Sequence, residues 1–372
     1  MPEDVLWPAE PHTLAKHAIL RRYLQAWLPI LSHQLAKAPR GPREFLFVDG
    51  FAGPGEYQGG EPGSPIIAIK AALDHSVQFP VPVRFLCVEQ DAARCEHLRE
   101  ILDRHKNEIA QSKNVRLTEP RCGDCDTVLA ELLDEIESRG TQFGPALAFL
   151  DQFGFSAVSM KLVKRILAYP QCEVFLYLDY KDMNRFITDP AKSAGFTRTY
   201  GGEEWRGAIQ LPESQRRELL LGEYKKALRV RAKVKYVSAF SMFDNNNSLL
   251  YWLIFCTNNL RGLEEMKKAM WKVDGTGGFR FSDRDNPAQF KLLNETFDQR
   301  WLAEELSDKL TGMTLSVSDV REHVLIQTPC CVFKDALKFL EYSDPPRIEV
   351  VSPPAARRRG SFKEESIQVR FV

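Results

Sequence analysis

The sequence predicts an α/β domain with a largely parallel sheet, followed by a smaller domain of helices and strands. In the first half of the chain, short apolar runs that end in an acidic residue alternate with helical stretches, which is typical of strands buried on both faces of a parallel sheet. Two later apolar runs, joined by a polar Asn-rich connection, indicate an antiparallel hairpin that closes the sheet. The last 80 or so residues change to a helical pattern with a basic turn.

Length and composition set the limits of this prediction. The chain has 372 residues, which corresponds to about two to three domains. Hydrophobic residues make up 44% and charged residues 27%, and 50 Lys and Arg balance 50 Asp and Glu. An electrostatic partner must therefore be inferred from local patches rather than from the net charge.

The sequence also predicts where the protein works. The longest apolar run, Leu249 to Cys256, is too short to span a bilayer, and the acidic start of the chain lacks a signal-peptide pattern. We therefore expect a cytoplasmic protein with no membrane partner. The eight cysteines are expected to be reduced thiols, and the close pair Cys122 and Cys125 lacks two further ligands at zinc-site spacing, so no metal site is expected.

Along the chain, a helix is expected first, from Thr13 as N-cap to about Leu28, where Pro29 would kink or end it. This forms an N-terminal helical segment over residues 1–42. The α/β domain is expected over residues 43–290. Its strands are expected at 44–49, 84–89, 115–117, 146–151, 174–179, 235–243 and 249–256, and its helices at 64–73, 92–105, 127–137, 160–167 and 263–271. Five parallel strands followed by a closing hairpin resemble the Rossmann-like sheet of class I methyltransferases.

Residues 291–372 are expected to form a separate domain. Helices are predicted from Phe297 to Leu310, after Ser318, and from Thr328-Pro329, with Thr as N-cap and Pro at the first helical position. Two strands, at 347–351 and 367–372, flank a basic turn-rich stretch. Three helices and a basic hairpin describe a winged helix-turn-helix domain.

The most informative segment is the glycine-rich loop Asp49-Gly-Phe-Ala-Gly-Pro-Gly55, directly after the first strand. Its spacing is neither that of a dinucleotide-binding loop nor that of a P-loop. It is similar to the Asp-x-Phe-x-Gly-x-Gly loop that holds S-adenosylmethionine in nucleic-acid methyltransferases. That resemblance places the Asp49 carboxylate near the ammonium or sulfonium charge of the cofactor, packs Phe51 beside it, and lets Gly53 and Gly55 approach closely. The alternative is a plain turn into a helix capped by Ser64 and opened by Pro65.

Three more acids follow later strands in order, at the sheet edge where open α/β sheets bind ligands. Glu89 ends the second strand, where a carboxylate can accept both ribose hydroxyls. Asp124 follows the third strand and could accept from the adenine amino group. Asp151 ends the fourth, where methyltransferases of amino groups place a substrate-polarising acid or amide. Each acid could instead be a strand-end or helix-cap residue.

Three motifs together resemble one family. Val48 to Gly55 with Gly63-Ser-Pro65, then Phe149-Leu-Asp-Gln-Phe-Gly154, then Met266-Lys-Lys-Ala-Met-Trp271 look like the three-Cys-motif partner protein family, TcmP. The resemblance implies a methyltransferase-like domain, a C-terminal winged helix and a partner that carries a three-cysteine, radical-SAM-like motif. Similar sequences read Asp-Pro-Phe-Gly after the fourth strand, whereas this chain has Gln152 in place of the proline. The missing proline therefore argues against methylation of a base amino group, but it does not argue against cofactor binding.

Basic residues predict two surfaces for nucleic acid. Residues 206–235 carry nine Lys and Arg against three Glu, in a helical pattern. In the winged helix, Lys334 and Lys338 are expected to be exposed one turn apart, and Arg357, Arg358 and Arg359 to lie in the wing. Residues 301–372 hold ten Lys and Arg against eleven Asp and Glu, so a protein partner for this domain stays open, as does a solvated basic face for 206–235.

The leading hypothesis is an S-adenosylmethionine-dependent methyltransferase whose substrate is DNA or RNA, or is presented by the radical-SAM-like partner. Asp151 would orient or polarise the acceptor, and Phe153 would stack on a base. The alternative is a non-catalytic methyltransferase-like module that recruits a partner enzyme to nucleic acid. An oxidoreductase is disfavoured because the glycine spacing differs from that of dinucleotide-binding loops.

Overall fold

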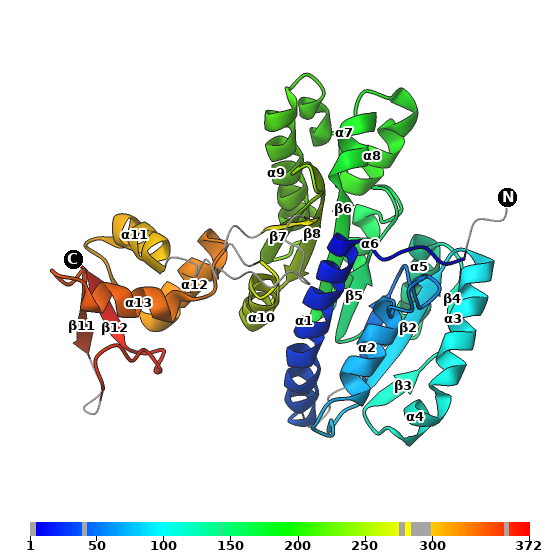
Figure 1. Cartoon of the computed structure of the whole chain (residues 1–372), viewed down its shortest axis with the longest axis horizontal. Helices are drawn as coiled ribbons and strands as arrows, with labels where there is room; N and C mark the ends of the chain where they lie inside the picture. Colours follow the sequence, from blue (N-terminus) through cyan, green and yellow to red (C-terminus); the bar gives the residue numbers. More distant parts are fainter. Residues whose placement is uncertain (1–4, 39–42, 142, 275–279, 284–298, 353–356) are drawn as a thin grey trace. The chain divides into compact units, whose positions relative to one another are not determined.

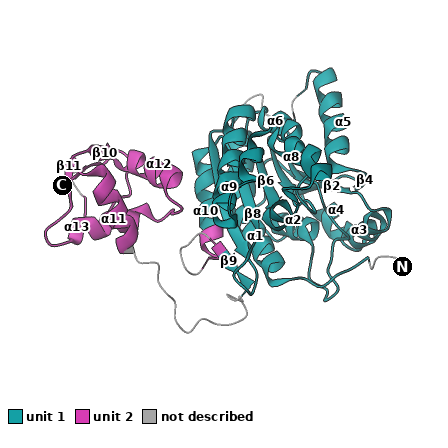
Figure 2. Ribbon diagram, turned by 90° about the horizontal axis from the view of Figure 1, so that it is seen from above, with its two compact units in different colours: residues 1–269, 281–288 teal, residues 270–280, 289–372 magenta. Residues whose placement is uncertain are grey.

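The computed structural model describes residues 5–38, 43–141, 143–274, 280–283, 299–352 and 357–372 (Figure 1). The chain divides into two compact units (Figure 2). The first contains residues 1–269 and 281–288, and the second contains residues 270–280 and 289–372. The domain boundary expected at residues 290 and 291 lies outside the described residues.

The first unit is built on a mixed, mostly parallel sheet, as the sequence predicts. Its strands lie in the order β3-β2-β1-β5-β6-β8-β7, and β9 is added beside β7. The first five are parallel, whereas β8 runs antiparallel to β6, and β7 antiparallel to β8. Their bounds are β1 Phe45–Asp49, β2 Val83–Glu89, β3 Val115–Leu117, β5 Ala146–Leu150, β6 Cys172–Asp179, β7 Tyr236–Phe243, β8 Leu249–Thr257 and β9 Arg280–Ser282. A two-residue strand that the sequence pattern did not show, β4 (Arg121–Cys122), pairs with the end of β2.

Both faces of this sheet are covered by helices, which explains the continuous apolar runs. On one face, Val48 and its counterparts in neighbouring strands pack against helices α5, α6, α8 and α9. On the other face, Phe45 packs on Trp27 of helix α1, and Phe255 on Tyr23 of the same helix. The helices are α1 Pro11–Ala36, α2 Ser64–Leu73, α3 Ala92–Arg104, α4 Lys106–Gln111, α5 Cys125–Ser138, α6 Met160–Leu167, α7 Tyr180–Phe186, α8 Ser193–Tyr200, α9 Glu213–Arg231 and α10 Leu260–Trp271. Among the described residues, no helix is both long and apolar enough to cross a membrane.

Helix α1 corrects the first prediction. Its N-cap is Glu10 rather than Thr13, and Pro29 lies inside the helix, which continues to Ala36. Proline removes one backbone hydrogen bond from a helix, but Leu31 and Leu35 beyond it are buried. Burial of these side chains offsets the lost bond, and the helix extends past the proline.

The second unit contains three helices and a three-stranded antiparallel sheet in the order β10-β12-β11. The elements are α11 Gln299–Leu310, β10 Thr314–Ser316, α12 Val317–Gln327, α13 Phe333–Tyr342, β11 Ile348–Ser352 and β12 Gln368–Phe371. A closed apolar core joins them, with Leu306, Val320, Leu337 and Val369 fully buried.

Two helix starts in this unit differ from prediction. Helix α12 begins at Val317, before Ser318 rather than after it, because its N-cap Ser316 forms a reciprocal capping box with Asp319. Helix α13 begins at Phe333, not at Thr328-Pro329. The Thr328 hydroxyl donates to the carbonyl of Val324, 2.9 Å away, and therefore ends α12 instead of starting the next helix.

Candidate functional site

Two neighbouring cavities lie where the parallel strands of the first unit end. The smaller, about 340 Å³, is lined by residues of the glycine-rich loop, by Glu89 and by Gly123. The larger, about 450 Å³, is lined by the same loop, by the start of α1 and by Asp151. Phe51 and Phe153 line both cavities. The predicted site residues of the first unit are thus brought together at one edge of the sheet, apart from Asp124.

The glycine-rich loop is tied to the neighbouring strands through its backbone. Gly50 N–H donates to the carbonyl of Phe149, and Ala52 N–H to that of Val88, each at 2.9 Å. Gly53 has φ +61° and Gly55 φ +90°, a region that side chains other than glycine rarely adopt. A Cβ on Gly55 would lie 2.9 Å from a methyl group of Leu98. Both glycines are therefore required by the conformation of the loop.

Asp49 is a buried acid with an unsatisfied oxygen. Its Oδ1 accepts from the N–H of Phe51 at 3.2 Å, whereas Oδ2 makes no hydrogen bond of ordinary geometry. Burial raises the pKa of Asp49 to about 7, although the nearby Ser64 hydroxyl and the Phe51 N–H oppose the shift. Asp49 itself lines neither cavity, but the next residues of the loop, Gly50 and Phe51, do. Buried polar atoms are nearly always paired, so an unpaired carboxylate oxygen at the start of this loop indicates a missing donor or cation.

Glu89 is held in place by two backbone amides. Gly53 N–H donates to Oε2 at 2.8 Å, and Asp91 N–H donates to Oε1 at 2.9 Å. Because each carboxylate oxygen can accept more than one hydrogen bond, Glu89 can still accept hydrogen bonds from the two hydroxyl groups of a diol bound in the smaller cavity. The loop and the end of β2 are thereby joined into one binding surface.

Asp124 is a helix-cap residue, which is the alternative to cofactor binding that the sequence left open. Its Oδ1 accepts from the backbone N–H and the hydroxyl of Thr127, at 2.9 and 2.8 Å, and so caps α5. The cavity is lined by its neighbours Gly123 and Cys125 rather than by Asp124 itself. The expected contact of Asp124 with adenine is therefore not supported.

The cysteines correct another expectation. Cys95 of α3 and Cys122 of β4 form a disulfide, so the eight cysteines are not all reduced thiols. The other six are free and buried. Cys122 pairs in register with Glu89, so the disulfide lies beside the smaller cavity. Within the described part of the chain no group of His, Cys, Asp and Glu could hold a metal ion.

Asp151 follows β5 and forms an ion pair with Lys16 of helix α1. The Lys16 side chain is buried, and its ammonium lies 5.8 Å from the ring centre of Tyr177 and 5.9 Å from that of Tyr251. This cation was not found from the sequence, where α1 was identified by its apolar residues alone. Its signal was a lysine, followed by His17, within a stretch from Leu14 to Ile19 whose other residues are apolar.

Phe153 is 68% exposed and lies between the two cavities. Its ring meets the edge of Trp7, with centres 6.0 Å apart, and Trp7 also contacts Tyr57 at 5.8 Å. The guanidinium of Arg94 lies 4.8 Å from the Trp7 ring. The segment before α1 thus adds an aromatic wall that the sequence analysis did not predict.

Gln152 is buried and held by two hydrogen bonds. Its amide nitrogen donates to the carbonyl of Tyr177 at 3.0 Å, and its oxygen accepts from the N–H of Val158 at 2.9 Å. These two bonds fix the loop that carries Phe153.

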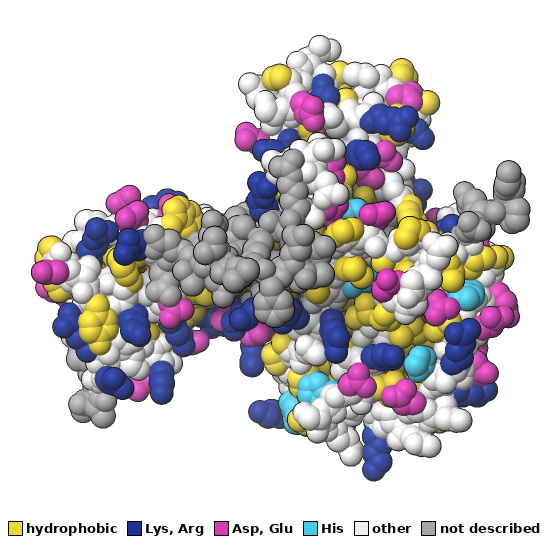
Figure 3. Space-filling model, viewed as in Figure 1, with side chains coloured by type: hydrophobic (Ala, Val, Ile, Leu, Met, Phe, Trp, Pro, Cys, Tyr) yellow, Lys and Arg dark blue, Asp and Glu magenta, His cyan; other side chains and the backbone are white. Residues whose placement is uncertain are grey.

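The basic helix α9 is partly engaged within the first unit. Arg216 donates to the Asn184 side chain at 2.7 Å and to two backbone carbonyls. Arg231 pairs with Glu204 and Lys226 with Glu223. Lys and Arg side chains are interspersed with Asp and Glu on the face shown in Figure 3.

In the second unit, the predicted basic residues divide into two kinds. Lys334, Lys338 and Arg358 are exposed, whereas Arg357 is buried in a two-pronged ion pair with Glu341, at 2.8 and 2.7 Å. Arg359 is exposed but donates to the backbone carbonyl of Glu341 at 2.7 Å. The prediction that Arg357 contacts nucleic acid is therefore corrected, because its guanidinium holds the unit together.

Solved structures similar to this chain include the METTL16 MTase domain, with 11% identical residues and a TM-score of 0.31, over 63% of this chain and 66% of that one, just under two thirds of its length. A protein from Staphylococcus aureus described as a caffeoyl-CoA O-methyltransferase matches with 12% identity and a TM-score of 0.27, over 62% and 82% of the two chains. A DUF574 family protein from Streptomyces avermitilis matches with 13% identity and a TM-score of 0.27, over 64% and 83%. No family model and no curated protein matches the sequence.

Proposed function

We propose that the first unit is an S-adenosylmethionine-dependent methyltransferase. The observation that carries the proposal is the orphaned Asp49 oxygen, which lies beside a glycine-rich loop whose amide is bound by Glu89. An anionic carboxylate without a partner suits a cationic ligand, and a carboxylate with spare lone pairs suits a ribose diol. The strand order, with a parallel sheet closed by a hairpin, agrees with this class of enzyme.

The residues present fit the cofactor. Asp49 would face its positive charge, Glu89 its ribose hydroxyls, and Gly53 and Gly55 would allow close backbone approach, with Phe51 packed alongside. S-adenosylmethionine, when bound, supplies an electrophilic methyl group. The protein's own contribution is to hold the acceptor in line and to exclude water, which can supply much of the rate enhancement of such a transfer.

The larger cavity is proposed to hold the acceptor. Lys16 occupies one oxygen of Asp151, and the remaining lone pairs of the carboxylate can still accept a hydrogen bond from the acceptor. Aromatic side chains from three segments, Phe153, Trp7 and Tyr177, suit a planar acceptor group such as a nucleobase. Lys16 would hold Asp151 in position and neutralise part of its charge.

The second unit is proposed to be a winged helix that brings the substrate or a partner to the site. Three helices, a three-stranded antiparallel sheet and a basic connection between β11 and β12 support this interpretation. Lys334, Lys338, Arg358 and Arg359 would contact the phosphates of DNA or RNA. By its resemblance to the TcmP family, the chain would act with a three-Cys-motif, radical-SAM-like protein in the cytoplasm.

Calorimetric titration with S-adenosylmethionine tests the cofactor site. We expect micromolar binding to the wild type and its loss in the Asp49→Ala and Gly53→Val variants. A control is Glu96→Ala, which removes an exposed acid of α3 that does not line either cavity. Absence of binding to the folded wild type would contradict the proposal.

The competing function is a non-catalytic module, in which Lys16 permanently occupies Asp151. Transfer of labelled methyl groups to nucleic acid, with and without the partner, separates the two. An Asp151→Ala variant that binds the cofactor but loses transfer supports the enzyme. If the Asp151→Ala variant retains the biological activity in full, the protein acts as a non-catalytic module.

A further inference from the structure

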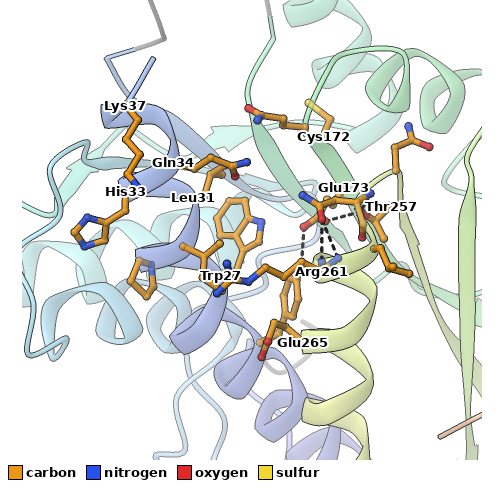
Figure 4. A pocket seen from close by; sticks show the side chains of 18 residues that line it. Trp27, Leu31, His33, Gln34, Lys37, Cys172, Glu173, Thr257, Arg261 and Glu265 are labelled. Atoms are coloured by element: carbon orange, nitrogen blue, oxygen red, sulfur yellow. Dashed lines mark hydrogen bonds between the residues drawn. The ribbon is translucent and has the colours of Figure 1, made fainter. Parts of the chain in front are cut away.

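A third, separate cavity of about 780 Å³ lies within the first unit at the opposite edge of the sheet (Figure 4). It is bounded by the C-terminal half of α1, the start of β6, the end of β8 and the start of α10. Its volume falls within the range of small-molecule sites, about 300 to 1,000 Å³. Asp49, Asp151 and the glycine-rich loop are at the other ends of the strands, so this cavity is not part of the candidate active site.

The floor of the cavity is apolar apart from one acid that is already satisfied. Trp27, Leu31 and Cys172 are buried there. Glu173 accepts hydrogen bonds from the hydroxyl groups of Tyr23 and Thr257, one at each carboxylate oxygen. Both oxygens of the acid on the floor are therefore already hydrogen-bonded, and the rest of the floor suits an apolar body.

The rim carries positive charge on opposite walls. Lys37 extends from the end of α1 and Arg261 from the first turn of α10, and both are exposed (Figure 4). Within the part of the chain that the structure describes, neither has an ion-pair partner. The acid on the rim, Glu265, is engaged by Lys268 at 3.0 Å. The rim charges that remain unpaired are therefore cationic.

We propose that this cavity binds a small organic anion, in which a compact aromatic or cyclic body carries one carboxylate, sulfonate or phosphate group. The body would pack on Trp27 and Leu31, and the anionic group would lie between Lys37 and Arg261. A small molecule is favoured over a protein segment because the volume of the cavity lies in the range of small-molecule sites and four elements of one unit bound it. The inference is independent of the proposed methyl transfer.

Two fluorescent probes test this proposal on the full chain: 8-anilinonaphthalene-1-sulfonate, and N-phenyl-1-naphthylamine, which has the same aromatic body without the sulfonate. We expect the wild type to bind one molecule of the sulfonate probe, at least ten times more tightly than it binds the neutral probe. The variant Lys37→Glu with Arg261→Glu is expected to lose that difference and to keep weak binding of the neutral probe. Saturating S-adenosylmethionine should leave the sulfonate titration unchanged.

Two further variants make the result specific. Leu31→Trp fills the cavity and should abolish binding of both probes. Arg22→Glu reverses an exposed charge on the same helix away from the cavity and should leave both titrations unchanged. Equal affinities of the wild type for the two probes, or an equal loss in Arg22→Glu, would overturn the proposal.

Discussion

Asp49 and Glu173 are two buried carboxyl groups at opposite edges of the same sheet, and their comparison separates a ligand site from a structural contact. Burial raises the pKa of each to about 7. Glu173 has a hydroxyl donor on each oxygen, whereas Asp49 has an oxygen with none. The raised pKa by itself shows only that each group is buried. The oxygen without a hydrogen-bond donor is what indicates a ligand site at Asp49.

The same distinction applies in the second unit. Arg357 and Arg358 are neighbours in the sequence and were predicted to serve the same purpose. Arg357 is paired with Glu341 and stacks on Phe362, with its guanidinium carbon 4.8 Å from the ring centre, whereas Arg358 is exposed. Only a basic residue whose charge is not already used can bind a phosphate strongly.

The largest effect is expected from Glu173→Gln. The folded-state pKa of Glu173 lies above its ordinary value, so the folded protein binds this proton more tightly than the unfolded chain does. Stability from this group is therefore lost as pH rises from about 4.5 to 7, by about 3 kcal/mol. Glutamine keeps the shape without the charge, so we expect a gain approaching this size at pH 8 and little change at pH 4.5.

Urea unfolding of wild type and Glu173→Gln at both pH values measures this difference. A similar change in the free energy of unfolding at pH 4.5 and pH 8 would show that the buried charge is not the cause. Because Asp49 is unchanged in the two proteins, its own titration cancels in the comparison.

The next effect is expected from Arg357→Ala. Removing one member of a buried ion pair leaves the other charge uncompensated, which should destabilise the second unit by about 2 kcal/mol, somewhat below the usual range because the pair lies near the surface. Arg358→Ala is the matched control and should change stability by less than about 0.5 kcal/mol. Thermal unfolding followed by circular dichroism compares the two, and equal effects would contradict the structural role of Arg357.

The sheet was largely predictable from the sequence because its strands are buried on both faces, which leaves continuous apolar runs such as Phe45 to Val48. The bounds of α2 and α6 were also predicted, since a proline or a Ser cap marks each start. The start of helix α13 was placed too early because Thr328 bonds back to the preceding helix, and β10 was missed because three residues carry too little pattern.

The candidate site was predictable where chemistry and chain position coincide, as for Asp49, Gly53 and Glu89. Lys16 and Trp7 were missed because they are distant from the glycine-rich loop in sequence and reach the cavity only through tertiary packing. The role of Asp124 depends on a local cap with Thr127, which sequence spacing allows but does not require.

A smaller effect concerns the pH dependence of cofactor binding. If Asp49 must be ionised to receive a cation, its pKa near 7 makes binding weaker at acidic pH, by about tenfold between pH 8 and pH 6. The nearby carboxylates Asp151 and Glu89 add to the elevation of that pKa. Calorimetry with S-adenosylmethionine measures the dependence. Asp49→Asn should bind more weakly with a flat profile, and a flat profile in the wild type would exclude Asp49 as the cation's partner.

The smallest effect is expected at the exposed basic residues of the second unit. Arg358→Ala or Lys338→Ala should weaken binding of a DNA or RNA duplex only a few-fold, because each would remove one phosphate contact. Each should also lower the slope of log affinity against log salt by about one. Arg347→Ala is a control outside the proposed interface and should leave the slope unchanged. Fluorescence anisotropy at several salt concentrations gives the slopes, and an unchanged slope in both Arg358→Ala and Lys338→Ala would assign this surface to a protein partner instead.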